Sequence, residues 1–195
     1  VVEKITPPPA PPPPPPVAVV TPEPVKKTRP PISTAPLRSG SRNRATAYFN
    51  KGVQQQQRNN LAAAISAYQD AIQADASFAT AYYNLAICYR TANQPDKALD
   101  NYELALRANP DYTDARFNYA ILLHEQGYTD DAIAQYERIV TANPNDAAAH
   151  LSLATIYAQN KATIAKARDQ YQTYIRLAPN SPLARDIRRW LEQNR

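Results

Sequence analysis

The sequence predicts an all-α protein built from stacked helical repeats. A tyrosine recurs at intervals of 34, 34 and 35 residues, at Tyr68, Tyr102, Tyr136 and Tyr171. An alanine stands four residues before each tyrosine, at Ala64, Ala98, Ala132 and Ala167. A fixed period of roughly 20 to 50 residues is typical of an array in which each repeat packs on its neighbours. Because such arrays present an extended surface, the period also indicates a protein that binds another molecule.

The repeats occupy residues 45–195. We expect four units, at 45–78, 79–112, 113–146 and 147–181, each with two helical segments separated by a turn. The expected turns contain residues that tolerate a left-handed backbone: Asn59-Asn60, Asn93-Gln94-Pro95, Gly127-Tyr128 and Asn160-Lys161. The fourth unit has one extra residue, which we place near Lys161.

These units resemble the tetratricopeptide repeat (TPR) family. The family has small residues where its helices cross most closely, and here the eighth position of each unit is Gly52, Ala86, Ala120 or Ala154. The aromatic fourth position is kept as Tyr48 and Tyr82 but changes to Arg116 and His150. The resemblance implies a right-handed solenoid whose first helices line a concave face. The departures suggest looser packing in units three and four.

A final amphipathic helix is expected at 182–195. Ser181 and Pro182 form an N-cap and a first-turn proline, and the apolar residues that follow share one face. The helix should therefore cover the exposed end of the last repeat, with Trp190 buried against it.

Residues 1–44 have a different composition. They contain 14 of the 19 prolines and no aromatic residue, so they cannot bury enough apolar surface to offset the entropy of ordering. We expect a disordered, Pro-rich, basic linker, in which residues 7–16 form a polyproline II spacer of roughly 30 Å. The same tract could instead be a ligand for an SH3-type or WW-type groove.

The net charge of +5 belongs to this linker, because the basic and acidic residues of 45–195 balance. Its basic residues are spread out and lack interleaved aromatics, so a solvated linker is favoured over binding to acidic lipid or nucleic acid. We expect no nucleic-acid partner.

The candidate binding face follows from the resemblance. An asparagine row at position six (Asn50, Asn84, Asn118, then Ser152) could pair with the backbone of an extended peptide, as in some family members, or could be structural. The neighbouring rows are apolar. The partner-binding residues that we predict are Phe49, Asn50, Val53, Tyr83, Asn84, Ile87, Arg90, Phe117, Asn118, Ile121, His124, Leu151 and Ser152. The alternative is that some of these side chains only complete the packing between first helices, or that a segment of the tail lies in the groove.

Other functions find little support in the sequence. The cationic residues with which some TPR domains clamp a chaperone carboxylate are replaced by residues such as Phe49, Tyr83 and Asp114. No metal-ligand spacing, phosphate loop or nucleophile motif occurs, so we expect no enzyme, cofactor, metal or small-molecule substrate. The single cysteine, Cys88, is interpreted as a small buried hydrophobic residue.

We therefore predict an adaptor that binds an extended peptide or a partner helix. One alternative is a structural subunit that packs into an assembly through its second helices, although their outward residues, such as Gln73 and Arg138, are polar. Another is a regulatory module of a longer protein. The chain begins at Val1 and lacks methionine, which we interpret as a fragment or processed product. A membrane connection is expected only through an anchor outside it, and the spacer favours a bacterial cell-envelope or periplasmic location over the cytoplasm.

Overall fold

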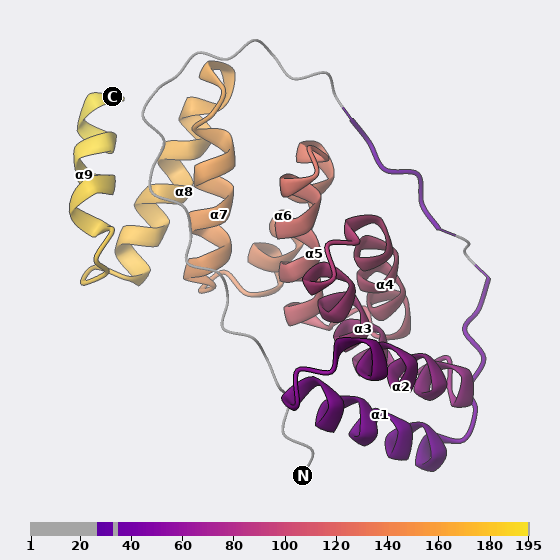
Figure 1. Ribbon diagram of the computed structural model, residues 1–195. Coiled ribbons are helices and arrows are strands. Elements are labelled where there is room, and N and C mark those ends of the chain that lie inside the picture. The colour runs from indigo at the N-terminus through magenta and orange to yellow at the C-terminus, as the bar shows by residue number, and fades with distance from the viewer. Residues whose placement is uncertain (1–26, 33–34, 195) are drawn as a thin grey trace. The chain divides into compact units, whose positions relative to one another are not determined.

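The computed structural model describes residues 27–32 and 35–194 (Figure 1). The polyproline tract and most of the expected linker lie outside these residues. All regular structure in the described ranges is helical, which confirms the predicted all-α fold of helix-turn-helix repeats. None of the helices there combines the length and the apolar character that a bilayer crossing requires.

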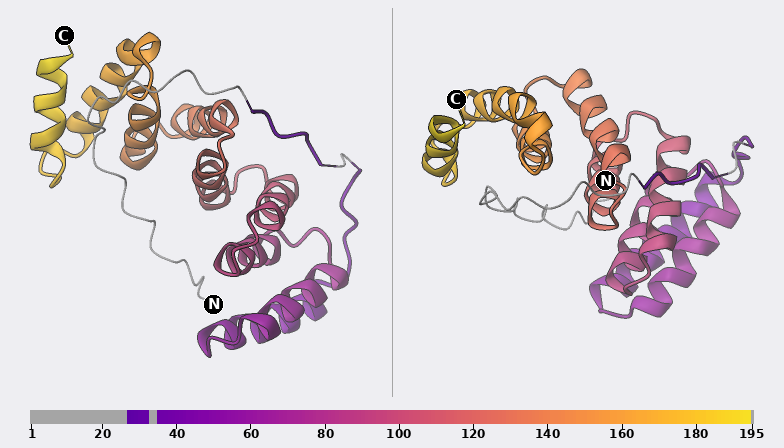
Figure 2. Two further views of the ribbon diagram at one scale, coloured as in Figure 1. Left: turned by 45° about the horizontal axis from the view of Figure 1, so that its top comes forward. Right: turned by 90° about the horizontal axis from the view of Figure 1, so that it is seen from above.

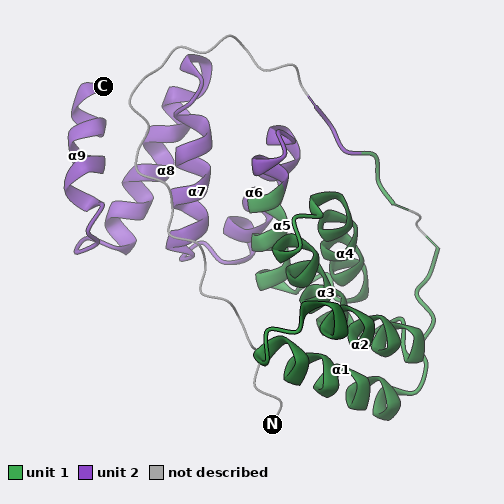
Figure 3. Cartoon of the chain, viewed as in Figure 1, with its two compact units in different colours: residues 1–8, 30–122 green, residues 9–29, 123–195 purple. Residues whose placement is uncertain are grey.

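The helices fall in the expected repeats. They are α1 (Arg42–Gln57), α2 (Leu61–Ala74), α3 (Ala79–Thr91), α4 (Pro95–Ala108), α5 (Thr113–Glu125), α6 (Thr129–Ala142), α7 (Ala147–Tyr157), the 3-10 turn η1 (Lys161–Thr163), α8 (Ile164–Leu177) and α9 (Ala184–Gln193). The described residues form two compact units, 30–122 and 123–194 together with 27–29 (Figure 3). In unit 1, α1 pairs with α2 and α3 with α4; in unit 2, α7 pairs with α8 (Figure 2).

The paired helices pack closely at the repeating alanines and tyrosines. Ala64, Ala98, Ala132 and Ala167 are fully buried, and the four repeating tyrosines are at most 2% exposed. In the first repeat, a Cβ atom added to Gly52 would lie 2.6 Å from the Tyr68 ring, so only glycine fits at this crossing. The period that predicted the fold is thus the spacing of these buried alanines and tyrosines.

Three of the four turns have the expected left-handed residue. Asn59 and Asn93 have φ of 59° and 57°, and Gly127 has φ of 81°. The fourth turn differs, because Asn160 is extended, with φ of −125°. Its side chain accepts a hydrogen bond from the N–H of Ala162 at 2.9 Å and begins η1, which accommodates the extra residue of this repeat.

Helix α1 begins at Arg42, three residues before the expected start of the repeats. The residues before it are also not a free linker where the structure describes them. The N–H of Ser41 donates to the carbonyl of Ala74 at 2.9 Å. A Cβ atom on Gly40 would stand 2.0 Å from that same oxygen, so the chain reaches α2 at a point where a side chain has no room.

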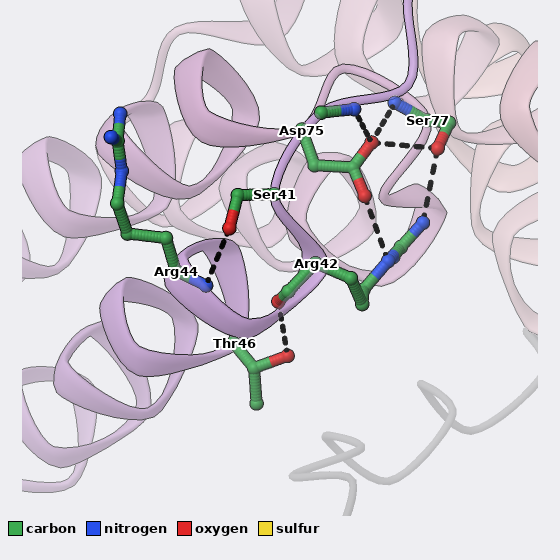
Figure 4. A network of polar contacts seen from close by, with 7 residues as sticks. Ser41, Arg42, Arg44, Thr46, Asp75 and Ser77 are labelled. Carbon is green, nitrogen blue, oxygen red and sulfur yellow. Dashed lines mark hydrogen bonds and ion pairs between the residues drawn. The ribbon is translucent and has the colours of Figure 1, made fainter.

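The carboxylate of Asp75 holds the residues that precede α1 against the end of α2 (Figure 4). Its Oδ1 atom accepts the N–H of Gly40 at 3.3 Å, the N–H of Ser77 at 2.9 Å and the Ser77 hydroxyl at 2.7 Å. Its Oδ2 atom pairs with Nε of Arg42 at 2.8 Å. Burial alone would raise the Asp75 pKa, but the hydrogen bonds from Ser77 and Gly40 and the Arg42 charge outweigh it, so the pKa is lowered from 3.8.

The last helix covers the end of the fourth repeat, as predicted, but begins later than expected. The hydroxyl of Ser181 accepts the N–H of Leu183 at 3.2 Å in a turn that contains Pro182, and α9 starts at Ala184. Trp190 is 9% exposed and packs edge-on against Tyr171 of α8, with ring centroids 4.8 Å apart.

We predict that Trp190→Ala lowers the free energy of unfolding by about 3–5 kcal/mol, because it removes a large buried ring. Since neighbouring repeats contribute separately to stability, α8 and α9 should unfold first. Urea titration followed by circular dichroism measures the loss, with the exposed Gln193→Ala as the control on the same helix. An unchanged urea midpoint for Trp190→Ala would show that α9 does not stabilise the repeat.

We also predict that Asp75→Asn lowers the unfolding free energy by about 1–2 kcal/mol at neutral pH, because a charged acceptor is lost while Arg42 stays half-exposed. The folded pKa of Asp75 is lowered, so its contribution is present above the unfolded pKa and is lost as the pH falls through the folded value. The difference in unfolding free energy between wild type and variant should shrink below about pH 4. Urea titrations at several pH values, with the exposed Asp96→Asn as control, test this. A gap that does not depend on pH would be inconsistent with it.

Candidate partner-binding face

The predicted binding residues lie on the first helix of each repeat. In unit 1 they come from α1, α3 and the part of α5 up to Leu122. In unit 2 they are His124 at the end of α5 and Leu151 and Ser152 on α7. The structure distinguishes them by burial.

Position five packs into the core in three of the four repeats. Phe49, Tyr83 and Leu151 are 2–3% exposed. The Phe49 ring lies 5.3 Å from that of Phe78, and the Tyr83 ring lies 5.0 Å from that of Tyr112. These three side chains therefore belong to the interior, and the two rings pack against residues of their own repeat. Burial likewise raises the pKa of Tyr83 to about 12.

In the position-six row, the side chains of Asn84, Asn118 and Ser152 donate hydrogen bonds to the main chain of their own helices. Nδ2 of Asn84 donates to the carbonyl of Thr80 at 2.9 Å, and Nδ2 of Asn118 donates to that of Asp114 at 2.9 Å. The hydroxyl of Ser152 donates to the carbonyl of Ala148 at 2.9 Å. Each of these acceptors lies four residues earlier, in the preceding helical turn.

Exposure separates the asparagines of this row. Asn50 is exposed, Asn84 is 3% exposed and Asn118 is half-buried. Nδ2 of Asn118 also lies 3.3 Å from the hydroxyl of Tyr83, which links α5 to α3. A ligand therefore has access to Asn50 and Asn118, whereas the Asn84 amide belongs to the interior.

The surface that remains accessible in unit 1 is smaller than the sequence predicted. Ile87 on α3 is buried, at 8% exposed. The half-buried predicted residues of this unit are Val53, Arg90, Phe117, Asn118 and Ile121. Three of these five lie on α5, at positions five, six and nine of its repeat.

Two titratable side chains on these helices, Cys88 and His124, have pKa values shifted by burial. Cys88 is fully buried, as predicted, and burial raises its pKa to about 12. Burial lowers the pKa of His124, which favours the neutral ring, although the charge of Glu125 acts in the opposite sense. Across residues 27–32 and 35–194, no group of three or more His, Cys, Asp or Glu side chains is placed to hold a metal ion.

Sequence reasoning missed contacts made by the second helices. Glu103 and Arg107 of α4 bind the main chain of the residues before α1, as does Asp131 at the start of α6. The sequence indicated only that the outward residues of the second helices are polar. One sequence feature could have indicated these contacts. Glu103 and Arg107 have opposite charges and are four residues apart, which places both on one side of a helix.

Comparisons with known proteins support the repeat architecture. Two family models, both described as tetratricopeptide repeat, match residues 49–111 and 90–156. Together they cover more than half of the chain. No curated protein matches the sequence.

Many solved structures share the fold. A crystal structure of MamA is 21% identical, with a TM-score of 0.64, and the match covers 71% of this chain and 81% of that one. A tetratricopeptide repeat protein from Parabacteroides merdae is 20% identical, with a TM-score of 0.71 over 78% of this chain and 60% of that one. The pilF protein of Pseudomonas aeruginosa is 23% identical, with a TM-score of 0.61 over 78% and 77%. At these identities the likeness concerns the fold alone.

We predict that Asn84→Asp lowers the unfolding free energy by about 2 kcal/mol or more, because it buries a charge and puts a carboxylate beside the Thr80 carbonyl. The equivalent change at the exposed position, Asn50→Asp, should alter it by no more than about 0.5 kcal/mol. The penalty at residue 84 should diminish in acid, where the buried carboxyl is protonated. Urea titrations of both variants measure the difference, and equal tolerance would mean that Asn84 is open to solvent after all.

Proposed function

The chain belongs to the tetratricopeptide repeat family, and we propose that it is an adaptor that binds a protein partner on the accessible part of its first helices. Repeats of this family are typically non-catalytic modules that serve as protein-interaction scaffolds. The finer proposal concerns which residues the partner contacts. It rests on the exposure of side chains in unit 1.

The observation that carries the proposal is the group Phe117, Asn118 and Ile121 on α5. All three side chains are half-buried, although their equivalents on α3 (Tyr83, Asn84 and Ile87) are buried. Phe117 and Ile121 are four residues apart and share one side of the helix. An aromatic ring and a branched aliphatic side chain that keep part of their surface exposed are typical anchors for a partner.

Asn118 supplies the polar contact beside these anchors. Its Nδ2 group is held by the carbonyl of Asp114 and by the hydroxyl of Tyr83, so the amide has a fixed orientation before a partner arrives. An oriented amide loses little rotamer freedom on binding, which favours affinity. Its carbonyl oxygen is suited to a main-chain N–H of an extended peptide or to a polar side chain of a partner helix.

A structural subunit remains the second candidate. That function requires apolar outward faces on the second helices, whereas Gln69 and Gln73 on α2 and Glu137 and Arg138 on α6 are exposed. Their polarity supports the adaptor. A regulatory role within a longer protein is compatible with the same binding face.

We predict that Asn118→Ala weakens partner binding about fivefold and Phe117→Ala about tenfold, the effects of one lost hydrogen bond and one lost anchor. The ligand is recovered by affinity capture with the full chain, identified by mass spectrometry and titrated by calorimetry against each variant. Circular dichroism confirms that the variants are folded.

The matched control is Asn101→Ala. Asn101 is half-buried on the second helix α4, as Asn118 is on α5, and its amide donates to the carbonyl of Lys97 at 2.7 Å, the same bond to the preceding turn that Asn118 makes. Its removal should leave affinity unchanged. Equal losses at residues 101 and 118 would indicate a general effect on the helices, and no loss at residues 117 and 118 would place the partner elsewhere.

An alanine scan of the recovered ligand distinguishes the two kinds of partner. Sensitive positions two residues apart indicate an extended peptide, and positions three or four apart indicate a helix.

A further inference from the structure

The chain before α1 contacts the second helix of the second repeat through its main chain. The N–H of Ile32 donates to Oε1 of Glu103 at 3.1 Å. The carbonyl of Ala35 accepts a hydrogen bond from Nη2 of Arg107. Glu103 and Arg107 are four residues apart on α4, so their side chains project from the same side of the helix. Together they contact one main-chain donor and one main-chain acceptor among the residues that precede α1.

This pair recognises the backbone and its direction. A carboxylate only accepts hydrogen bonds and a guanidinium only donates them, so an N–H must face Glu103 and a carbonyl must face Arg107. Both bonds involve a charged group and are stronger than bonds between neutral groups. The side chains of Ile32 and Ala35 take no part in them, so this recognition does not depend on their identity.

The prolines of the segment prepare it for such binding. Pro30 and Pro31 fix their own φ angles, and Pro31 and Pro36 restrict Pro30 and Ala35 before them to extended conformations. Because proline has no N–H, Ile32 provides the first main-chain donor after these two prolines. An already extended segment loses less entropy when it binds.

A second anchor holds the other end of this segment. Gly40 and Ser41 donate their N–H groups to Asp75 and to the carbonyl of Ala74, and Arg42 pairs with Asp75 (Figure 4). The equivalent residues of the next two repeats are Asn109 and Asn143, which accept the N–H two residues later. Asp75 makes that same bond to Ser77 and uses its extra charge for Arg42. The first repeat is therefore adapted to bind the incoming chain.

Unit 2 makes a contact of the same chemistry. The N–H of Arg29 donates to Oδ2 of Asp131, in the first turn of α6, at 2.9 Å. The ammonium group of Lys27 donates to the carbonyl of Gln126 at 3.2 Å and lies 4.2 Å from the centre of the Tyr128 ring. A carboxylate on a second helix thus accepts a main-chain N–H in each unit.

We propose that the second helices of unit 1 form a second binding surface, suited to a proline-containing segment, and that residues 30–32 and 35–41 are its occupant. The surface is separate from the first-helix residues assigned to a partner. The linker residues bound to this surface belong to the folded protein, so they do not lengthen the spacer. They also cover polar side chains that would otherwise be solvated.

The test uses the full chain and substitutions in the linker, which leave the helices unaltered. Ile32→Pro removes the N–H that Glu103 accepts, and Ile32→Ala keeps it. Arg38 lies between the two anchors, so trypsin cleavage after Arg38 reports release of the segment. We expect cleavage at Arg38 to be about tenfold faster in Ile32→Pro, as expected for the loss of a bond to a charged group, and close to wild type in Ile32→Ala.

Hydrogen exchange gives an independent measure. The amides of Ile32 and Gly40 should exchange several-fold more slowly than in an unstructured peptide, and Arg107→Ala should accelerate exchange at Ile32. The control Arg138→Ala, which removes an exposed arginine from α6, should not. Exchange at the unstructured rate in the wild type, or equal cleavage of Ile32→Pro and Ile32→Ala, would overturn the proposal.

Measurements at several protein concentrations show which copy provides the segment. Protection at Ile32 that is constant with concentration, in a chain that sediments as a monomer, supports binding within one chain. Protection that rises together with dimer formation would mean that copies exchange their linkers, and would overturn the assignment of the chain's own segment as occupant.

Discussion

A small residue and a tyrosine, both buried and at fixed positions of each repeat, are the constraint on which the rest of the structure depends. In the first repeat the Tyr68 ring lies so close to Gly52 that a methyl group would overlap it, and the Tyr68 hydroxyl donates to Gln56 at 2.8 Å. This contact sets how near the two helices approach. It thereby determines which side chains of the first helix point inward and which keep contact with solvent.

The helices and their order were predictable because these contacts are local and recur in sequence. The binding face was less predictable. In the sequence, nothing distinguishes buried from exposed residues at position five. In the structure, the Tyr83 ring packs against the rings of Tyr102 and Tyr112, with centroids 6.1 and 5.0 Å away, whereas Phe117 keeps part of its surface accessible. The difference depends on the rings that surround position five in each repeat, so a single row of the sequence does not reveal it.

The linker contacts were hidden for another reason. A main-chain N–H is present in every residue except proline, so a segment that binds through its backbone has no apolar period. Low hydrophobicity then suggests disorder. The sequence signal lies in the side chains that bind this backbone. Asp75 stands where the next two repeats have asparagine, and Glu103 stands four residues before Arg107. A Pro-rich segment beside a repeat array is best interpreted together with the charged side chains of the array.

The linker contacts change what the polar outward faces of the second helices imply. Polar outward faces on the second helices argue against a large apolar contact with another subunit, and that inference stands. They do not show that these faces are free, because a carboxylate and a guanidinium are suitable partners for the backbone of an extended chain. Side-chain burial and main-chain pairing thus give the first and the second helices different chemistry. The first helices offer half-buried apolar groups around an oriented amide, and the second helices offer charges that bind a backbone.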